Sequence, residues 1–304
     1  MQRTAPKVIY MKSLKILNLK NIIPFVGNVA SLVARELGHW YMNGAAYGKH
    51  IVALAVENIL MCSDRELPEE LEDRSLLTIL GYKSPPDHSI FSKVRKDVGE
   101  EKIGKVVELI IQEFYRGRVI SSIAIDSTYI PYYFEEDYDA TYGYVTLNKK
   151  EQKLLKEKTQ KGIKKGYKLH IIYDVDTRIP LYWIVLPANI HDKDAFKTLF
   201  DYVITHFKFA HNAKFLADSA YDSTDVRLLL REHRIISVIA VNGRGHYNSE
   251  KPKDKDYRKR SAIERFFSIL KMKLNLLNVR VKGLQRVTVH ANSCILGYLL
   301  KYIL

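Results

Sequence analysis

Cysteine is scarce in this chain of 304 residues, since Cys62 and Cys294 are its two thiols. They lie near opposite ends of the sequence, and no C-x-x-C pair is present. The sequence therefore encodes neither a disulfide framework nor a cysteine zinc site. We expect both thiols to be reduced and buried.

Long apolar runs are also lacking. The longest, residues 22–34 and 51–62, are too short to cross a bilayer, and Pro24 and Glu57 interrupt them. Lysines spread through the first 20 residues break up the compact apolar segment that a secretion signal needs. These absences predict a cytoplasmic protein without a membrane span.

Acidic residues are too few to balance the basic ones, 34 against 48, which leaves a net charge of +14. The excess lies in residues 149–168 and 242–286, while the rest of the chain is close to neutral. Two basic segments indicate a polyanion partner, because neutralising phosphates releases counterions. Nucleic acid is the natural candidate, with Lys161, Lys164 and Lys165 as contacts. The alternative is a pair of solvated lysine-rich loops.

Hydrophobic residues make up 47% and charged residues 27% of the chain, as in ordinary folded proteins. The length allows two domains. Residues 51–60, 69–80 and 103–114 carry apolar residues at helical spacing, and strand patterns are nearly absent before residue 119. We therefore predict an all-helical N-terminal domain over residues 1–118.

A turn at residues 81–87 with paired prolines separates two of these helices, and Asp87 or Ser89 can cap the second. This gives a helix-turn-helix pattern, and we expect this domain to bind DNA. A plain corner of a helical bundle is the alternative. The side chains of the second helix that could enter a major groove are small or basic: Ser89, Ser92, Lys93, Arg95 and Lys96.

From residue 119 the pattern changes to short β-rich runs with helical stretches between them. The strands are expected at residues 119–125, 167–175, 181–186, 215–217 and 235–241. The helices are expected at residues 194–207, 222–233, 261–274 and 284–303. This alternation predicts an α/β domain over residues 119–304, with a mixed sheet flanked by helices.

Three acids lie where such a sheet can bring carboxylates together: at the ends of two predicted strands and on a following helix. Asp126 and Asp218 each end a short apolar run, and Glu264 lies on the following basic helix. Clustered carboxylates repel one another and persist mainly when a cation such as Mg²⁺ or Mn²⁺ holds them. Each acid has an alternative role: an Asx turn for either aspartate, and a capping box with Ser261 for Glu264. Asp222 competes with Asp218, but its sequence context favours capping of the next helix.

Glu264 also belongs to a polar stripe. At about 100° per residue, Tyr257, Arg260, Glu264 and Lys271 fall within an arc of roughly 60° on one helix. Such a stripe suits a phosphodiester held at a metal. The alternative is an Arg260–Glu264 ion pair worth a few tenths of a kcal/mol, and a cap at Ser261 would leave Tyr257 and Arg260 ahead of the helix.

The spacing Tyr257-x2-Arg260-x3-Glu264-x6-Lys271 resembles the Tyr, Arg, Glu, Lys motif of the DDE transposases of bacterial and archaeal insertion sequences. The resemblance runs from about residue 60 to the end of the chain. It implies a ribonuclease H-like catalytic fold, with Asp126, Asp218 and Glu264 as the catalytic, metal-binding triad. The large β insertion that some members carry between the second acid and the glutamate is missing. Shorter blocks match in the same order: residues 86–92, 125–128, 166–170, 188–192 and 217–222.

The resemblance implies a DNA transposase that binds the terminal inverted repeats of an insertion sequence and catalyses strand cleavage and strand transfer. It implies two Mg²⁺ or Mn²⁺ ions about 4 Å apart, with Tyr257, Arg260 and Lys271 holding phosphates. The implied partners are double-stranded DNA, as repeats and as target, and a second copy of the chain on the nucleoid. The alternatives are an idle DNA-binding protein derived from a transposase and a stand-alone nuclease of the same fold.

Overall fold

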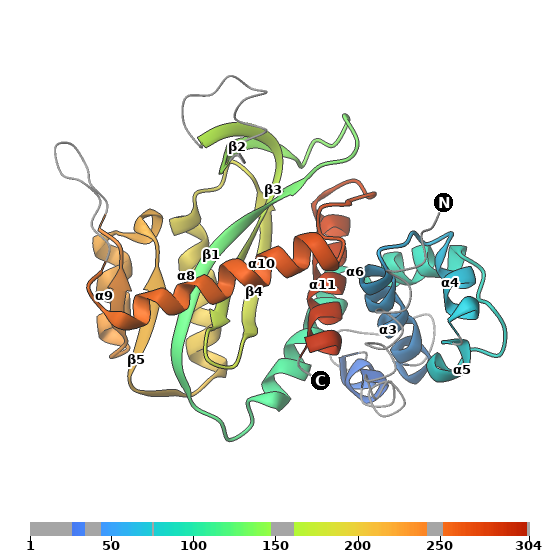
Figure 1. Ribbon diagram of the computed structural model, residues 1–304, viewed down its shortest axis with the longest axis horizontal. Helices are drawn as coiled ribbons and strands as arrows, with labels where there is room; N and C mark the ends of the chain where they lie inside the picture. The colour runs from blue at the N-terminus through green and yellow to red at the C-terminus, as the bar shows by residue number, and fades with distance from the viewer. Residues whose placement is uncertain (1–25, 34–43, 75, 147–160, 242–251, 303–304) are drawn as a thin grey trace, which may run out of the picture. The chain divides into compact units, whose positions relative to one another are not determined.

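The structure is a computed structural model that describes residues 26–33, 44–74, 76–146, 161–241 and 252–302. The chain forms two compact units (Figure 1). The helical unit combines residues 1–110, 268–276 and 288–304. The sheet unit combines residues 111–267 and 277–287. These units divide the chain differently from a single boundary at residue 118, because two C-terminal segments belong with the N-terminal helices.

The sheet unit contains one mixed sheet of six strands. β3 pairs antiparallel with β1 and β4, whereas β5 pairs in parallel with β1 and β6. β2 also pairs with β3, and without it the order β4-β3-β1-β5-β6 is that of a ribonuclease H-like sheet, so the predicted fold class is confirmed. The strands are β1 Ile120–Pro131, β2 Thr141–Thr146, β3 Lys161–Asp174, β4 Ile179–Pro187, β5 Phe209–Ala217 and β6 Ile236–Ile239.

Helices cover both faces of this sheet, with α10 in front of the strands and α8 behind them in Figure 1. On one face the ring of Phe266 in α10 (Ser261–Lys273) packs on Tyr173 of β3, with 5.0 Å between ring centroids. On the other, Phe196 of α8 (Asp192–His206) packs edge-on against Phe215 of β5. Because successive strand residues point to opposite faces, the buried runs of β1 and β3 serve both layers.

The one strand that sequence patterning missed is β2, which pairs with the first half of β3 as a two-stranded ribbon. Gly143 and Val145 face the core, and at Gly143 a Cβ atom would lie 1.9 Å from the carbonyl oxygen of Ala188. Only glycine permits so close an approach of the two backbones. A run of tyrosine, glycine and threonine with few aliphatic residues gives no clear strand signal.

The helix α9 (Thr224–Glu232) and the 3₁₀ segment η2 (Lys255–Arg260) precede α10 in the chain. Ser223 is the N-cap of α9, since its hydroxyl accepts a hydrogen bond from the Val226 amide. The prediction that Asp222 caps this helix is therefore wrong; its carboxylate binds the Arg227 guanidinium at 2.8 Å. η2 then leads directly into α10.

The helical unit packs the C-terminal helix among the N-terminal ones. Gly297 of α11 lies against α3, since a Cβ atom there would be 3.2 Å from the Ala55 carbonyl oxygen. The Asn292 amide donates to the Glu100 carbonyl, and residues 291–300 are all buried. The helices are α3 Gly44–Leu60, α4 Leu67–Asp73, α5 Leu77–Leu80, α6 Ser89–Phe114 and α11 Leu284–Tyr302.

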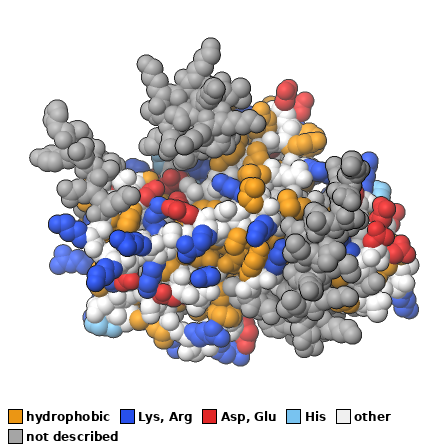
Figure 2. Space-filling model, in the orientation of Figure 1, with side chains coloured by type: hydrophobic (Ala, Val, Ile, Leu, Met, Phe, Trp, Pro, Cys, Tyr) orange, Lys and Arg blue, Asp and Glu red, His pale blue; other side chains and the backbone are white. Residues whose placement is uncertain are grey.

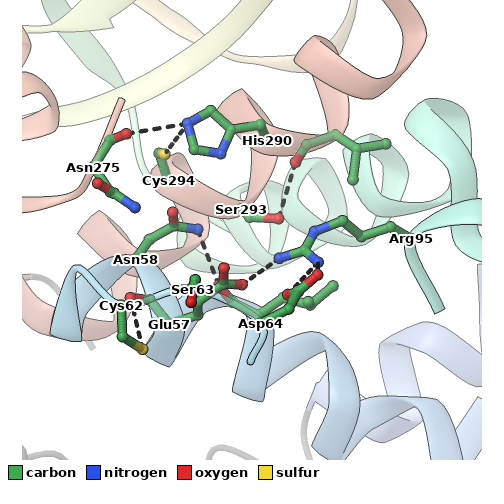
Figure 3. A network of polar contacts seen from close by, with 12 residues as sticks. Glu57, Asn58, Cys62, Ser63, Asp64, Arg95, Asn275, His290, Ser293 and Cys294 are labelled. Atoms are coloured by element: carbon green, nitrogen blue, oxygen red, sulfur yellow. Dashed lines mark hydrogen bonds and ion pairs between the residues drawn. The ribbon is translucent and has the colours of Figure 1, made fainter. Parts of the chain in front are cut away.

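The predicted turn between helices is present: Gly81 has a left-handed φ of 77°, and the Asp87 carboxylate caps α6 by accepting from the Ser89 amide. Arg95 of α6, however, is held inside the unit by Glu57 and Asp64 (Figure 3). Its predicted place in a DNA groove is wrong, because leaving two partly buried carboxylates unpaired is costly. Ser92, Lys93 and Lys96 are exposed on the same helix.

Figure 3 also shows the imidazole of His290 between the Asn275 carbonyl oxygen, at 3.1 Å, and the Cys294 thiol, at 3.8 Å. Cys62 and Cys294 are both free and buried. Among the described residues, no helix is long and apolar enough to span a membrane.

Candidate active site

Two parallel strands bring Asp126 and Asp218 to one edge of the sheet. Ala124 of β1 pairs with Leu216 of β5, and each aspartate follows its paired residue by two positions. Adjacent parallel strands place such residues side by side. Both aspartates also make the local turn contacts that were the alternative reading: Asp126 accepts from the Ser127 amide at 2.8 Å, and Asp218 from the Ala220 amide at 2.9 Å.

The carboxylates of Asp126 and Asp218 interact electrostatically. Burial and, next, the charge of Asp218 raise the pKa of the Asp126 carboxyl to about 7. The Arg260 guanidinium and the Ser127 amide oppose this rise, and Asp192 adds to it. A carboxyl with so high a pKa marks a place where negative charge is concentrated without enough compensation.

Arg260 connects Asp126 to Glu264. Its Nη1 lies 3.1 Å from Oδ2 of Asp126, and its Nη2 lies 2.5 Å from Oε1 of Glu264. Tyr257 lies in the same group. Burial raises the pKa of its phenol, and the charges of Arg260, Asp218 and Glu264 also act on it. Three distant stretches of sequence thus meet around one guanidinium.

The start of α10 decides between the two sequence readings of Glu264. Ser261 has helical backbone angles and the helix follows η2 without a break, so no capping box forms. Glu264 instead pairs with Arg260, so the Arg260–Glu264 ion pair that was the alternative to the polar stripe is present. Tyr257 and Arg260 lie on η2 ahead of the α-helix, so the single helical stripe is wrong in detail, although both side chains still reach the site.

Lys271 lies further along α10, in the part that belongs to the helical unit. The lysines of the first basic segment lie on β3. Lys164 and Lys165 place their ammonium groups over the rings of Tyr129 and Tyr132, at 5.6 and 4.8 Å. Lys161 begins β3, but its side chain lies outside the described residues, as do residues 147–160 and 242–251 of the two basic segments. Figure 2 shows further lysine and arginine side chains over α9 and the start of α10.

Sequence reasoning missed a fourth acid, Asp192, at the start of α8. Its Oδ1 accepts from the Ser127 hydroxyl at 3.0 Å and lies 3.3 Å from the Lys168 ammonium. His170 of β3 is fully buried, with Nδ1 at 3.6 Å from the same oxygen. Burial lowers the pKa of His170 to about 4, so this imidazole is neutral at pH 7. The signal was present as polar residues in the blocks 166–170 and 188–192.

Tyr221 is buried next to the carboxylates and lies on the short η1 segment (Ser219–Tyr221) after Asp218. Burial and then the charges of Asp192, Asp126 and Asp218 raise the pKa of its phenol. Its hydroxyl is buried and has no hydrogen-bond partner among the described residues. The phenol of Tyr221 therefore keeps its proton beside the three carboxylates.

The donors fit a hard divalent cation in chemistry. Asp126 and Asp218 offer carboxylate oxygens whose mutual repulsion such an ion would relieve. Across the part of the chain that the structure describes, no three acidic, histidine or cysteine side chains already surround a common point. Arg260 stands between Asp126 and Glu264, so its guanidinium must shift before both carboxylates can bind one ion.

Comparison with known proteins agrees with this geometry. The family described as "Transposase DDE domain" matches residues 117–300, more than half of the chain. No curated protein matches the sequence.

Solved structures are similar at low TM-scores, among them the three that follow. A piggyBac transposase synaptic complex with hairpin DNA has 10% identity and a TM-score of 0.42, covering 96% of this chain and 74% of that one. The Mos1 strand transfer complex has 13% identity and a TM-score of 0.25, covering 80% and 79%. The mariner Mos1 paired end complex with Mg has 11% identity and a TM-score of 0.23, covering 78% and 77%.

The extent of the family match decides the assignment, and the sheet topology described above is compatible with it. This chain belongs to the transposase DDE domain family.

Proposed function

We propose that this chain is a DNA transposase that binds the terminal inverted repeats of an insertion sequence and catalyses metal-dependent strand cleavage and strand transfer. The observation that supports this most is the meeting of Asp126, Asp218 and Glu264 around Arg260 at one edge of the sheet. A protein that only binds DNA gains nothing from carboxylates that repel phosphate.

In this proposal Asp126, Asp218 and Glu264 hold Mg²⁺ or Mn²⁺, and two such ions are expected. When bound, they supply Lewis-acid stabilisation of charge on the phosphate. Arg260 exchanges its carboxylate partners for phosphate oxygens, with which its planar fork makes paired hydrogen bonds. Tyr257 and Lys271 add further phosphate contacts.

The surrounding residues support this role. Lys168 and Ser127 hold Asp192 in place, and the buried rings of His170 and Tyr221 exclude water from the inner side of the carboxylates. A dry, fixed environment strengthens interactions with charge that develops during phosphoryl transfer.

DNA binding is proposed for two regions. One is the helical unit, through the exposed Ser92, Lys93 and Lys96 of α6. The other is the lysine-bearing start of β3, where Lys161, Lys164 and Lys165 contact phosphates. We propose that two copies act together on the two ends of the element, in the cytoplasm at the nucleoid.

The test is a cleavage assay on supercoiled DNA that carries the flanking terminal repeats, with Mg²⁺ and then Mn²⁺. We expect cleavage and strand joining by the wild type and none by Asp126→Ala. Asp201→Ala is the matched control, since Asp201 is exposed on α8 and pairs only with Lys197 among the described residues.

Equal cutting by Asp126→Ala would defeat the triad assignment. Binding of the repeats without any cutting by the wild type would favour the idle DNA-binding protein. Cutting that needs no terminal repeats and ends without joining would favour the stand-alone nuclease.

A further inference from the structure

A tyrosine-rich face lies on the ribbon of β2 and β3, away from the carboxylates. Tyr142 pairs with Lys165, and Tyr144 with Ile163. Directly opposed residues of an antiparallel pair point to the same side, so these four side chains form one face, called the ribbon face below. Tyr142 and Tyr144 are 68% and 67% exposed, and Ile163 is 56% exposed.

Protein packing does not account for this exposure. The backbones of Tyr142 and Tyr144 belong to the β2–β3 ladder, but neither side chain makes a hydrogen bond or ring contact with any described residue. The opposite side of β2 carries Gly143, which packs on Ala188, so the ribbon is anchored by one side and presents its rings on the other. Contiguous exposed apolar side chains of this kind mark interaction sites.

The nearby loop between β1 and β2 extends the same chemistry. Tyr133 and Phe134 are exposed and pack edge to face, with centroids 4.8 Å apart. Tyr138, 86% exposed, lies under the ammonium of Lys282 at 5.5 Å. Exposed rings therefore lie on this loop as well as on the ribbon, and Lys282 lies beside one of them.

We propose that the ribbon face binds unpaired nucleotides of DNA by stacking their bases on Tyr142 and Tyr144, an inference that rests on the proposed function. Proteins that bind single strands combine basic grooves with exposed aromatic rings, because every base has a stacking face. The two rings are two strand positions apart, about 6.8 Å. That spacing is twice the repeat of about 3.4 Å between stacked bases, so one base fits between the rings.

Charge favours unpaired bases over duplex backbone at this place. Lys165 of the ribbon face can meet a phosphate, whereas Lys164 points to the opposite side of the ribbon, and the exposed acids Glu135 and Glu136 lie on the adjoining loop. These acids repel a phosphate backbone on that side, whereas an uncharged base can stack beside them.

The ribbon is also within reach of the candidate active site. β1 and β3 run together from Asp126, opposite Ile171, to Pro131, opposite Gly166, where the ribbon starts. Five residues of strand span about 17 Å, the length of about five nucleotides at B-form rise. A strand with its scissile phosphate at the carboxylates can thus place unpaired bases on the ribbon face.

Fluorescence anisotropy of the full chain with three labelled probes tests this: a 20-nucleotide single strand, the matching duplex, and that duplex with a five-nucleotide unpaired tail. For Tyr142→Ala/Tyr144→Ala we expect binding of the single strand and the tailed duplex to weaken about tenfold or more, and duplex binding to change less than about twofold. Tyr142→Phe/Tyr144→Phe should retain binding, because phenylalanine also stacks. Ile236→Ala removes an exposed apolar side chain from β6 and is the control.

A 2-aminopurine in the tail adds a direct readout, since its fluorescence should be quenched by the wild type and the Phe variant only. Equal weakening of all three probes, or no change in any, would overturn the proposal. So would loss of self-association in the Ala variant by sedimentation, which would make the face an interface between copies. Far-UV circular dichroism checks folding of each variant. Because Asp126→Ala should still bind the single strand, the result is independent of whether the chain cuts DNA.

Discussion

The cluster of carboxylates around Asp126, in the middle of β1, predicts that the metal-free protein becomes less stable as pH rises. The pKa of Asp126 rises from 3.8 to about 7 on folding, through burial first and the charge of Asp218 second. A carboxyl whose pKa rises on folding binds its proton more tightly in the folded state. Its contribution to stability is therefore fully present below pH 3.8 and is lost as pH rises through 7.

The size of this effect follows from the shift. About three pKa units at 1.36 kcal/mol each give an upper limit of about 4 kcal/mol. The Asp126 side chain is 21% exposed, and water screens part of the penalty. We therefore expect the free energy of unfolding of Asp126→Asn, relative to that of the wild type, to increase by about 1 to 2 kcal/mol from pH 5 to pH 8, which corresponds to several degrees in Tm.

Thermal unfolding in EDTA, followed by circular dichroism from pH 5 to pH 8, measures this gain. The exposed Asp201 of α8 provides the control variant Asp201→Asn, which should follow the wild type. Adding Mg²⁺ at pH 8 should stabilise the wild type more than Asp126→Asn, because binding to the folded state alone raises stability. A gain that is absent, or equal at pH 5 and pH 8, would refute the reasoning.

Three further predictions concern other parts of the chain. Arg260→Ala should lower strand cleavage by about 10² to 10³, as loss of a transition-state donor does, while repeat binding in a gel-shift assay changes much less; equal losses in both would contradict this. Gly143→Ala should destabilise the ribbon by about 1 to 3 kcal/mol, since its Cβ would lie 1.9 Å from the Ala188 carbonyl oxygen; an unchanged denaturant midpoint would contradict it. Replacing Lys164 and Lys165 by glutamine should reduce the salt dependence of duplex binding by about 0.9 for each phosphate that the protein no longer neutralises, and an unchanged slope would assign these lysines to solubility.

Much of the sheet unit was predictable because its signals are local. Apolar β-rich runs marked β1, β3, β4, β5 and β6, and each aspartate at the end of such a run lies where parallel strands meet. β2 was missed because its pairing depends on a glycine contact with Ala188, which is distant in sequence. Asp192 was missed because a single aspartate before a helix has an ordinary capping role, and only the fold brings it to Ser127 and Lys168.

The helical region shows the opposite balance. Its helices could be predicted from apolar spacing, but the burial of Arg95 in ion pairs could not. A basic residue on an amphipathic helix is expected in solvent, and only the tertiary fold supplies Glu57 and Asp64 as partners. The local sequence at Ser261 offered, as an alternative, that Tyr257 and Arg260 precede the α-helix, but it did not show the 3₁₀ segment on which they lie.

The helical unit is assembled from three separate stretches of chain, the last of which begins at residue 288. The contact between α11 and α3 can therefore form only after nearly the whole polypeptide has been synthesised, since it joins segments that are far apart in sequence. A copy truncated by a stop codon or a frameshift before that point exposes the apolar surface that α11 would cover. We expect such a remnant to be more susceptible to proteolysis than the intact chain.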